Sequence, residues 1–218
     1  MPIWNKITFQ DRNSPLIEHL TFFHDHSIII LCSITVITFY LIISSITSKN
    51  FNRFFLEAQE IELFWTRIPA LILLFIAIPS LKTLYLIEEN INPLISIKRI
   101  GFQWNWSYQY SNLKEINFSS LIIKSNSKRL IDTSNHLIIP IQTPTRIIIT
   151  SKDVLHSWTI PSLGVKADAT PGRINQIILI INRPRTLIGQ CSEICGAGHR
   201  FIPISVEATS IKNFIKNI

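Results

Sequence analysis

Charged residues are scarce in this chain, since Asp, Glu, Lys and Arg make up only 16% of its 218 residues. With a mean hydropathy of +0.29, this excludes a wholly water-soluble protein and favours one soluble domain with a membrane anchor. The sequence has no internal repeat and no low-complexity tract. The formal net charge is +7, but the basic residues are scattered and form no nucleic-acid-binding motif. We therefore expect a basic surface or contact with anionic lipid, and no nucleic-acid partner.

Long stretches without charge occur in two places. Residues 28–47 contain no charged side chain, and a helix of that length, at about 1.5 Å per residue, crosses a hydrocarbon core of about 30 Å. A second apolar segment, 63–87, carries Arg67 and Lys82, so that alone it would be a marginal span or a buried helix. Because a clear first span precedes this segment, we predict that it forms the second helix of a membrane hairpin. The first apolar run begins too late for a cleavable signal sequence, and none is expected. The polar lead-in before it contains Asn-Ser-Pro at residues 13–15, which is expected to break any helix.

The pattern changes from Leu94 onward. Short apolar or alternating runs, rich in β-branched residues, are separated by polar or Pro/Gly turns, which predicts an all-β sandwich or barrel. Residues 210–218 could add a final short helix. The predicted strands are 94–100, 104–110, 121–124, 137–141, 146–150, 177–181, 187–189 and 202–207.

The candidate metal ligands are concentrated in one loop. Cys191 and Cys195 are four residues apart, His199 follows four residues later, and His156 lies far upstream. Two thiolates and two imidazoles form a soft ligand set that suits copper or zinc and not calcium or magnesium. A structural disulfide or a pair of buried thiols is the alternative. One cysteine loop with a distant histidine differs from a zinc ribbon and is typical of copper electron-transfer sites on β-barrels.

These motifs closely resemble cytochrome c oxidase subunit II of the mitochondrially encoded kind. The resemblance implies a two-helix transmembrane hairpin followed by a cupredoxin-like barrel, with both termini in the intermembrane space of the mitochondrial inner membrane. It runs nearly end to end, through residues 23–26, 52–62, 79–82, 103–108, 153–173 and 189–199. The implied parts are an intermembrane-space lead-in (1–26), a first helix (27–48), a matrix loop (49–62), a second helix (63–88) and the copper domain (89–218).

The resemblance also implies a function. The chain would take electrons from cytochrome c and pass them to haem in subunit I, where oxygen is reduced to water and protons are pumped. Its partners would be subunit I, the other oxidase subunits, cytochrome c and inner-membrane lipid. A copper-delivery protein with a thioredoxin-like fold is the main rival, but it has one span. A quinol-oxidase homologue, the other alternative, lacks the cysteine loop.

Copper ligands follow from the same resemblance. Cys191 and Cys195 would bridge two copper ions, and His156 and His199 would each complete one of them. The backbone carbonyl of Glu193 would be a weak copper ligand, while its carboxylate would reach a magnesium ion shared with subunit I. The alternatives are a core histidine at 156 and an exposed loop acid at 193.

Two further roles come from the resemblance. Trp104 would receive electrons from cytochrome c, although its alternation with Trp106 and Tyr108 also fits core packing on one strand face. Glu62 would border the mouth of a proton-uptake path in subunit I. A carboxylate at a helix start also interacts favourably with the helix dipole, which is the alternative for Glu62.

The chain departs from the family at one copper ligand. The family has a methionine three residues after the loop histidine, and this chain has Ile202, which cannot coordinate a metal. The departure belongs to a wider imbalance, because the chain contains 44 isoleucines and a single methionine, Met1. A genuine Ile202 would leave a copper without its weak axial sulfur and shift its potential.

Five arginines stand where the family usually has serine or another uncharged residue: Arg12, Arg67, Arg99, Arg185 and Arg200. Arg67 interrupts the second span, at a cost of up to about 3 kcal/mol, and Arg200 adds a cation beside the copper ligands. In many invertebrate mitochondria AUA encodes methionine and AGA encodes serine. We hypothesise that the sequence reflects a code that reads these codons as isoleucine and arginine. Ile202 would then be methionine, and Arg67 and Arg200 serine, in the living protein.

Overall fold

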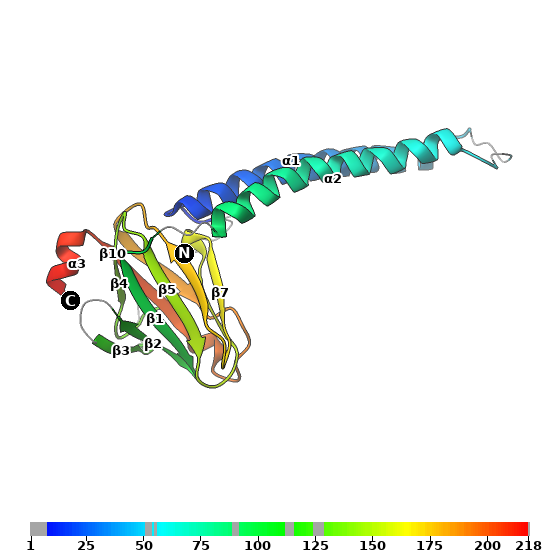
Figure 1. Cartoon of the computed structure of the whole chain (residues 1–218). Coiled ribbons are helices and arrows are strands. Elements are labelled where there is room, and N and C mark those ends of the chain that lie inside the picture. The colour runs from blue at the N-terminus through cyan, green and yellow to red at the C-terminus, as the bar shows by residue number, and fades with distance from the viewer. Residues whose placement is uncertain are drawn as a thin grey trace. The chain divides into compact units, whose positions relative to one another are not determined.

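The computed structural model describes residues 8–50, 54, 56–88, 92–111, 116–123 and 129–217. The chain divides into two compact units, one formed by His19–Ile87 and the other by Met1–Glu18 with Glu88–Ile218. The first unit contains most of the long helices α1 (Pro15–Thr47) and α2 (Gln59–Glu88), which lie side by side in Figure 1. The second unit contains the β-strands.

Helix α1 begins earlier than the sequence indicated. Ser14 and Pro15 were expected to break any helix, and that prediction is wrong from Pro15 onward. Proline suits the first helical position because its missing N–H would have had no partner there. The Ser14 hydroxyl accepts a hydrogen bond from the Ile17 N–H at 3.2 Å, as an N-cap does. The cap itself is buried, since the same hydroxyl donates to the Leu163 carbonyl at 2.7 Å.

Both helices are long and apolar enough to cross a membrane. Large apolar side chains such as Ile29, Val36 and Leu73 are exposed along them, which suits a lipid environment. Helix hydroxyls bond to their own backbone, as when Thr35 donates to the Leu31 carbonyl at 2.8 Å. The His26 ring bonds to the Phe75 carbonyl at 3.2 Å and so links the two helices.

The described β unit has ten strands. Five form one sheet in the order β3-β2-β1-β5-β8, three form a second sheet in the order β4-β10-β9, and β6 pairs with β7. Figure 1 shows them layered around a shared interior. Their bounds are β1 Ile95–Phe102, β2 Asn105–Tyr110, β3 Ile116–Ser120, β4 Leu137–Pro140, β5 Thr145–Ser151, β6 His156–Ile160, β7 Val165–Ala169, β8 Asn175–Leu179, β9 Arg185–Gln190 and β10 Pro203–Thr209.

The core consists of the buried residues that alternate with half-buried ones along the strands. In β1 and β5, which are parallel neighbours, every second residue is buried, so that Ile97 and Ile147 face the interior together. Trp106 and Trp158 fill the same interior and are fully buried. Helix α3 (Ile211–Asn217) closes the chain as predicted and buries Phe214 in this core.

The predicted strand pattern was incomplete. β3, β6 and β7 were not predicted, because their runs are short. β3 and β6 also contain polar residues that are buried only in the tertiary fold, and β7 alternates small or apolar buried residues with an exposed Lys166 and Asp168. Of the predicted strand 121–124, the described part contains one isolated bridge, between Ile122 and Thr133, and Lys124 lies outside the described residues. Trp104 is not in a strand but in the tight turn between β1 and β2.

Candidate metal centre

The cysteine loop connects β9 to β10 and is held at both ends by backbone hydrogen bonds. The Cys191 N–H donates to the Ile202 carbonyl at 3.1 Å, which closes the loop at its base. The Ser192 N–H donates to the Ser157 carbonyl at 3.1 Å, which attaches the loop to β6. His156 is the first residue of β6, so this attachment brings a residue from far upstream to the cysteines.

Each thiol faces the Nδ1 atom of one imidazole. The Cys191 Sγ lies 3.9 Å from the His156 Nδ1, and the Cys195 Sγ lies 3.5 Å from the His199 Nδ1. The ligand atoms of His156, Cys191 and Cys195 all lie within 4.8 Å of one another, and these three residues are buried. His199 is half-buried in the short 3₁₀ helix η2 (His199–Phe201). The structure therefore brings all four predicted sulfur and nitrogen ligands together.

The two thiols differ in acidity. Burial opposes ionisation of Cys191, but hydrogen bonds, first among them that with His156, lower its pKa to about 7. Burial, and then the negative charge on Cys191, raise the pKa of Cys195 to about 12. Without a cation, the two thiols are therefore not both ionised at neutral pH, because Cys195 keeps its proton. A bound metal cation stabilises the second thiolate, and the soft sulfur and nitrogen donors fit copper.

Asp153 is the outer partner of His156. Its Oδ1 lies 2.8 Å from the His156 Nε2, on the ring nitrogen that faces away from the cysteines. Burial works against a charged imidazole, but bonds to Cys191 and Asp153 raise the pKa of His156. A carboxylate in this position fixes the ring orientation and leaves Nδ1 directed at the thiol. The Asp153 Oδ2 also accepts the Gln103 N–H at 2.5 Å, so one side chain holds both the histidine and the β1–β2 turn.

Trp104 lies against the cysteine loop. Its indole N–H donates to the Cys195 carbonyl at 3.3 Å, and the Gln103 side-chain amide donates to the same carbonyl at 2.9 Å. A Cβ on Gly198 would lie 2.3 Å from the Trp104 ring, so only glycine permits this approach. Trp104 is 42% exposed, whereas Trp106 and Tyr108 are fully buried. It therefore connects the surface to the loop, and the core-packing interpretation holds only for the other two.

The other predicted site residues lie in different parts of the structure. Glu193 is half-buried in the loop, and its carbonyl accepts a weak hydrogen bond from the Cys191 Sγ at 3.4 Å. Ile202 follows η2 and is 2% exposed in the same core cluster as Cys191. Glu62 is an exposed residue in the first turn of α2, in the other compact unit.

Sequence reasoning missed the residues that hold the ligands in place. Asp153 was visible three residues before His156, but no local pattern distinguishes an outer partner from any other nearby acid. Gln103 and Gly198 carried no signal, because their roles depend on contacts between segments about 90 residues apart.

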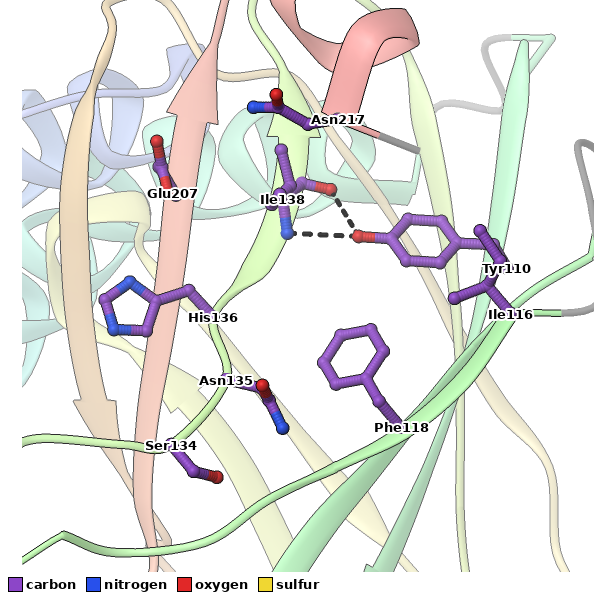
Figure 2. Close-up of a pocket in the computed structure, with 9 residues that line it drawn as sticks. All are labelled: Tyr110, Ile116, Phe118, Ser134, Asn135, His136, Ile138, Glu207 and Asn217. Atoms are coloured by element: carbon purple, nitrogen blue, oxygen red, sulfur yellow. Dashed lines mark hydrogen bonds between the residues drawn. The ribbon is translucent and has the colours of Figure 1, made fainter.

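A pocket of about 450 Å³ lies elsewhere in the β unit and shares no residue with the metal ligands (Figure 2). Phe118 and the Tyr110 ring form its aromatic side. The Tyr110 hydroxyl donates to the Ile138 carbonyl at 2.7 Å and accepts its N–H at 3.0 Å, so both backbone groups of an edge-strand residue are satisfied. We assign this pocket no chemistry.

Comparison with known proteins agrees with this geometry. The family model described as cytochrome c oxidase subunit II, periplasmic domain, matches residues 95–209, and the model of its transmembrane domain matches residues 2–83. The periplasmic domain of subunit II from Bradyrhizobium japonicum is 35% identical, with a TM-score of 0.56, over 58% of this chain and 91% of that structure.

Curated relatives match over nearly the whole chain. Cytochrome c oxidase subunit 2 of the moth Yponomeuta malinellus is 53% identical, over 99% of this chain and 97% of the relative. That of the cockroach Periplaneta americana is 50% identical, over 99% of this chain and 96% of the relative. With both family models matched, the chain belongs to the cytochrome c oxidase subunit II family, the membrane-anchored, copper-binding subunits that transfer electrons within a haem–copper oxidase.

Proposed function

We propose that this chain takes single electrons from cytochrome c at a binuclear copper centre and passes them to haem in subunit I. Oxygen is reduced to water there, and the reaction is coupled to proton pumping across the mitochondrial inner membrane. The observation that carries the proposal is the pairing of each cysteine sulfur with one histidine Nδ1 directly beneath Trp104.

Four side chains and one carbonyl hold the coppers in this proposal. Cys191, Cys195, His156 and His199 would hold the two ions, and the Glu193 carbonyl would be a weak further ligand. A pair of coppers held by shared thiolates would supply a one-electron relay with little reorganisation. The protein's contribution is rigidity, because Asp153, Gln103 and the loop-base hydrogen bonds hold the ligands before any metal binds.

Electrons arrive at Trp104. The side chain is partly exposed and so open to a docked cytochrome c, and its N–H donates to the carbonyl of the proposed copper ligand Cys195. The path from the protein surface to the metal ligand thus crosses one aromatic ring and one hydrogen bond.

The other proposed contacts lie at partner subunits. The Glu193 carboxylate supplies half of a magnesium site whose remaining ligands come from subunit I, since a single half-buried carboxylate cannot hold a hard cation alone. We place residues 1–26 and 89–218 in the intermembrane space and the segment 49–62 in the matrix, with the membrane-spanning segments, formed by α1 and α2, at 27–48 and 63–88. Glu62, at the start of α2, then lies at the matrix side, where it borders the proton-uptake path of subunit I.

Copper loading of the intact chain in detergent tests the proposal. We expect two coppers per chain, a purple colour and an electron paramagnetic resonance spectrum in which one unpaired electron is shared by two copper nuclei. A single copper per chain, or zinc bound in preference to copper, would contradict the binuclear assignment.

Trp104→Phe is expected to slow electron transfer from cytochrome c by at least about tenfold, equivalent to about 1.4 kcal/mol of barrier. The substitution removes the N–H that bonds the Cys195 carbonyl while it keeps an aromatic ring. Stopped-flow oxidation of cytochrome c by the assembled oxidase measures the effect, and the copper spectrum should stay unchanged. Trp106→Phe is the matched control, because the same chemical change two residues later falls in the buried core. Equal rates for the two variants would exclude Trp104 as the point of arrival.

A further inference from the structure

Arg99 occupies a position that belongs to the hydrophobic core. Residues of β1 alternate between the interior and a half-buried outer face, and Arg99 follows Ile97 on the inner side. It is fully buried, and its guanidinium carbon lies 3.5 Å from the centre of the Trp158 ring. Its partners on the adjacent strands, Tyr108 and Ile149, are also fully buried.

The Arg99 guanidinium has no hydrogen-bond partner. Nε, Nη1 and Nη2 are all buried and unpaired within the described structure. Burial lowers the pKa of Arg99 from 12.5 to about 9, so the side chain still carries its charge at neutral pH. Stacking on Trp158 compensates part of the charge but satisfies none of the N–H donors. A buried and unpaired charge is strongly destabilising, and this one serves no ligand of the metal centre.

Two neighbours of Arg99 offer its guanidinium no hydrogen bond. The Tyr108 hydroxyl and the Trp158 indole N–H are buried, and the contact they make is with each other and falls short of a well-formed hydrogen bond. Native cores pair nearly all buried donors, so a guanidinium with three unpaired nitrogens beside these groups indicates the wrong side chain at position 99. A serine would remove the charge and leave space beside the two polar groups. A water molecule in that space can bond to both, and the serine hydroxyl can donate and accept in turn.

Physically unfavourable side chains occur at two other positions. Arg67 lies inside α2, a helix long and apolar enough to cross a membrane. Ile202 is buried at the base of the cysteine loop, where its backbone carbonyl bonds to Cys191 and its side chain offers no donor atom. The chain has 44 isoleucines and one methionine, the imbalance that results when methionine positions are read as isoleucine.

We propose that the living protein has serine at position 99 and methionine at position 202, because its gene is translated with AGA as serine and AUA as methionine. The inference rests on the proposed mitochondrial location, and the full-length relatives described above are insect proteins. The same rule assigns serine to four other positions: Arg12, Arg67, Arg185 and Arg200. The serines remove a charge from the core and another from the second span, and a methionine in place of Ile202 adds a sulfur beside the copper ligands.

Mass spectrometry of the native protein tests the proposal. The oxidase is purified from its source organism, and peptides that cover residues 99 and 202 are sequenced by fragmentation. We expect serine at 99, which also removes a tryptic cleavage site, and methionine at 202. Arginine at 99 or isoleucine at 202 overturns the proposal. Copper analysis of the same sample tests the proposed function separately, since the peptide sequence does not depend on metal content.

Unfolding of the recombinant full chain in detergent tests the physical argument. Arg99→Ser is expected to raise the thermal midpoint by at least about 5 °C relative to the chain with arginine. Arg99→Met, which keeps the length and removes the charge, should raise it as well. Arg146→Ser is the matched control on the half-buried outer face of neighbouring β5 and should change the midpoint by less than about 2 °C. A chain with Arg99 that is as stable as both Arg99 variants would contradict the structural basis.

Discussion

Cys191→Ser and Cys195→Ser are each expected to abolish the two-copper spectrum completely. Each thiolate would be a ligand of both metals in the proposed centre, so one substitution would remove a ligand from each ion. A serine hydroxyl is a hard, weakly acidic donor and does not replace a thiolate for copper. Both sulfurs are buried beside an imidazole, and the loop contains no third cysteine to take their place.

Metal analysis and electron paramagnetic resonance of the copper-loaded chain measure this effect. Cys32→Ser is the matched control, since Cys32 is an exposed residue of α1. It should retain both coppers and the mixed-valence signal. A variant of either loop cysteine that kept the two-copper signal would refute the ligand assignment. Loss of the signal in Cys32→Ser would show that the substitutions act through folding.

Gly189→Ala is expected to destabilise the β unit by at least about 3 kcal/mol and to weaken copper binding. A Cβ at Gly189 would lie 1.8 Å from the Thr159 carbonyl oxygen, which is backbone and cannot turn aside. Gly189 is on β9, which leads into Cys191, and Thr159 is on β6, which begins with His156. The methyl group therefore forces apart the two strands that bring the first histidine to the first cysteine.

Thermal unfolding of the intact chain measures the loss, with copper content determined on the same samples. Gly172→Ala is the control: its φ is +76° and nothing lies within 4 Å of a Cβ there. The free energy of unfolding of that variant should fall by only about 1–2 kcal/mol, the cost of a left-handed backbone conformation in alanine. The variant should keep its copper. Equal losses in the two glycine variants would show that the contact between β6 and β9 is not required.

The expected family is confirmed, as are the hairpin with a cupredoxin-like domain and the role in electron transfer. The sequence was sufficient for these because the informative features are local. An uncharged run in 28–47 determines a membrane helix wherever it occurs, and the spacing of Cys191, Cys195 and His199 is set within one loop. The individual ligand roles, the magnesium at Glu193 and the proton path at Glu62 stay predictions.

The sequence predictions failed where the role of a residue depends on its structural surroundings. Pro15 was expected to break a helix, but a proline starts one when a capping serine precedes it, as Ser14 does. Trp104 was assigned to a strand because of its alternation with Trp106, but the chain turns at that point and exposes the ring. Arg99 looked unusual only by comparison with the family, and its cost became visible once β1 placed it among Tyr108 and Trp158.

The sequence by itself thus determined the membrane anchor, the β-rich class of the second unit and the soft ligand set of the loop. The tertiary structure decided which atoms meet. His156 reaches Cys191 because the Ser192 N–H bonds to β6, and Asp153 directs the ring because the β1–β2 turn holds its other oxygen. The contacts of Ser192 with β6 and of Asp153 with the β1–β2 turn join residues tens of positions apart. Their formation depends on strand register and close backbone approach, and no local pattern encodes either of these.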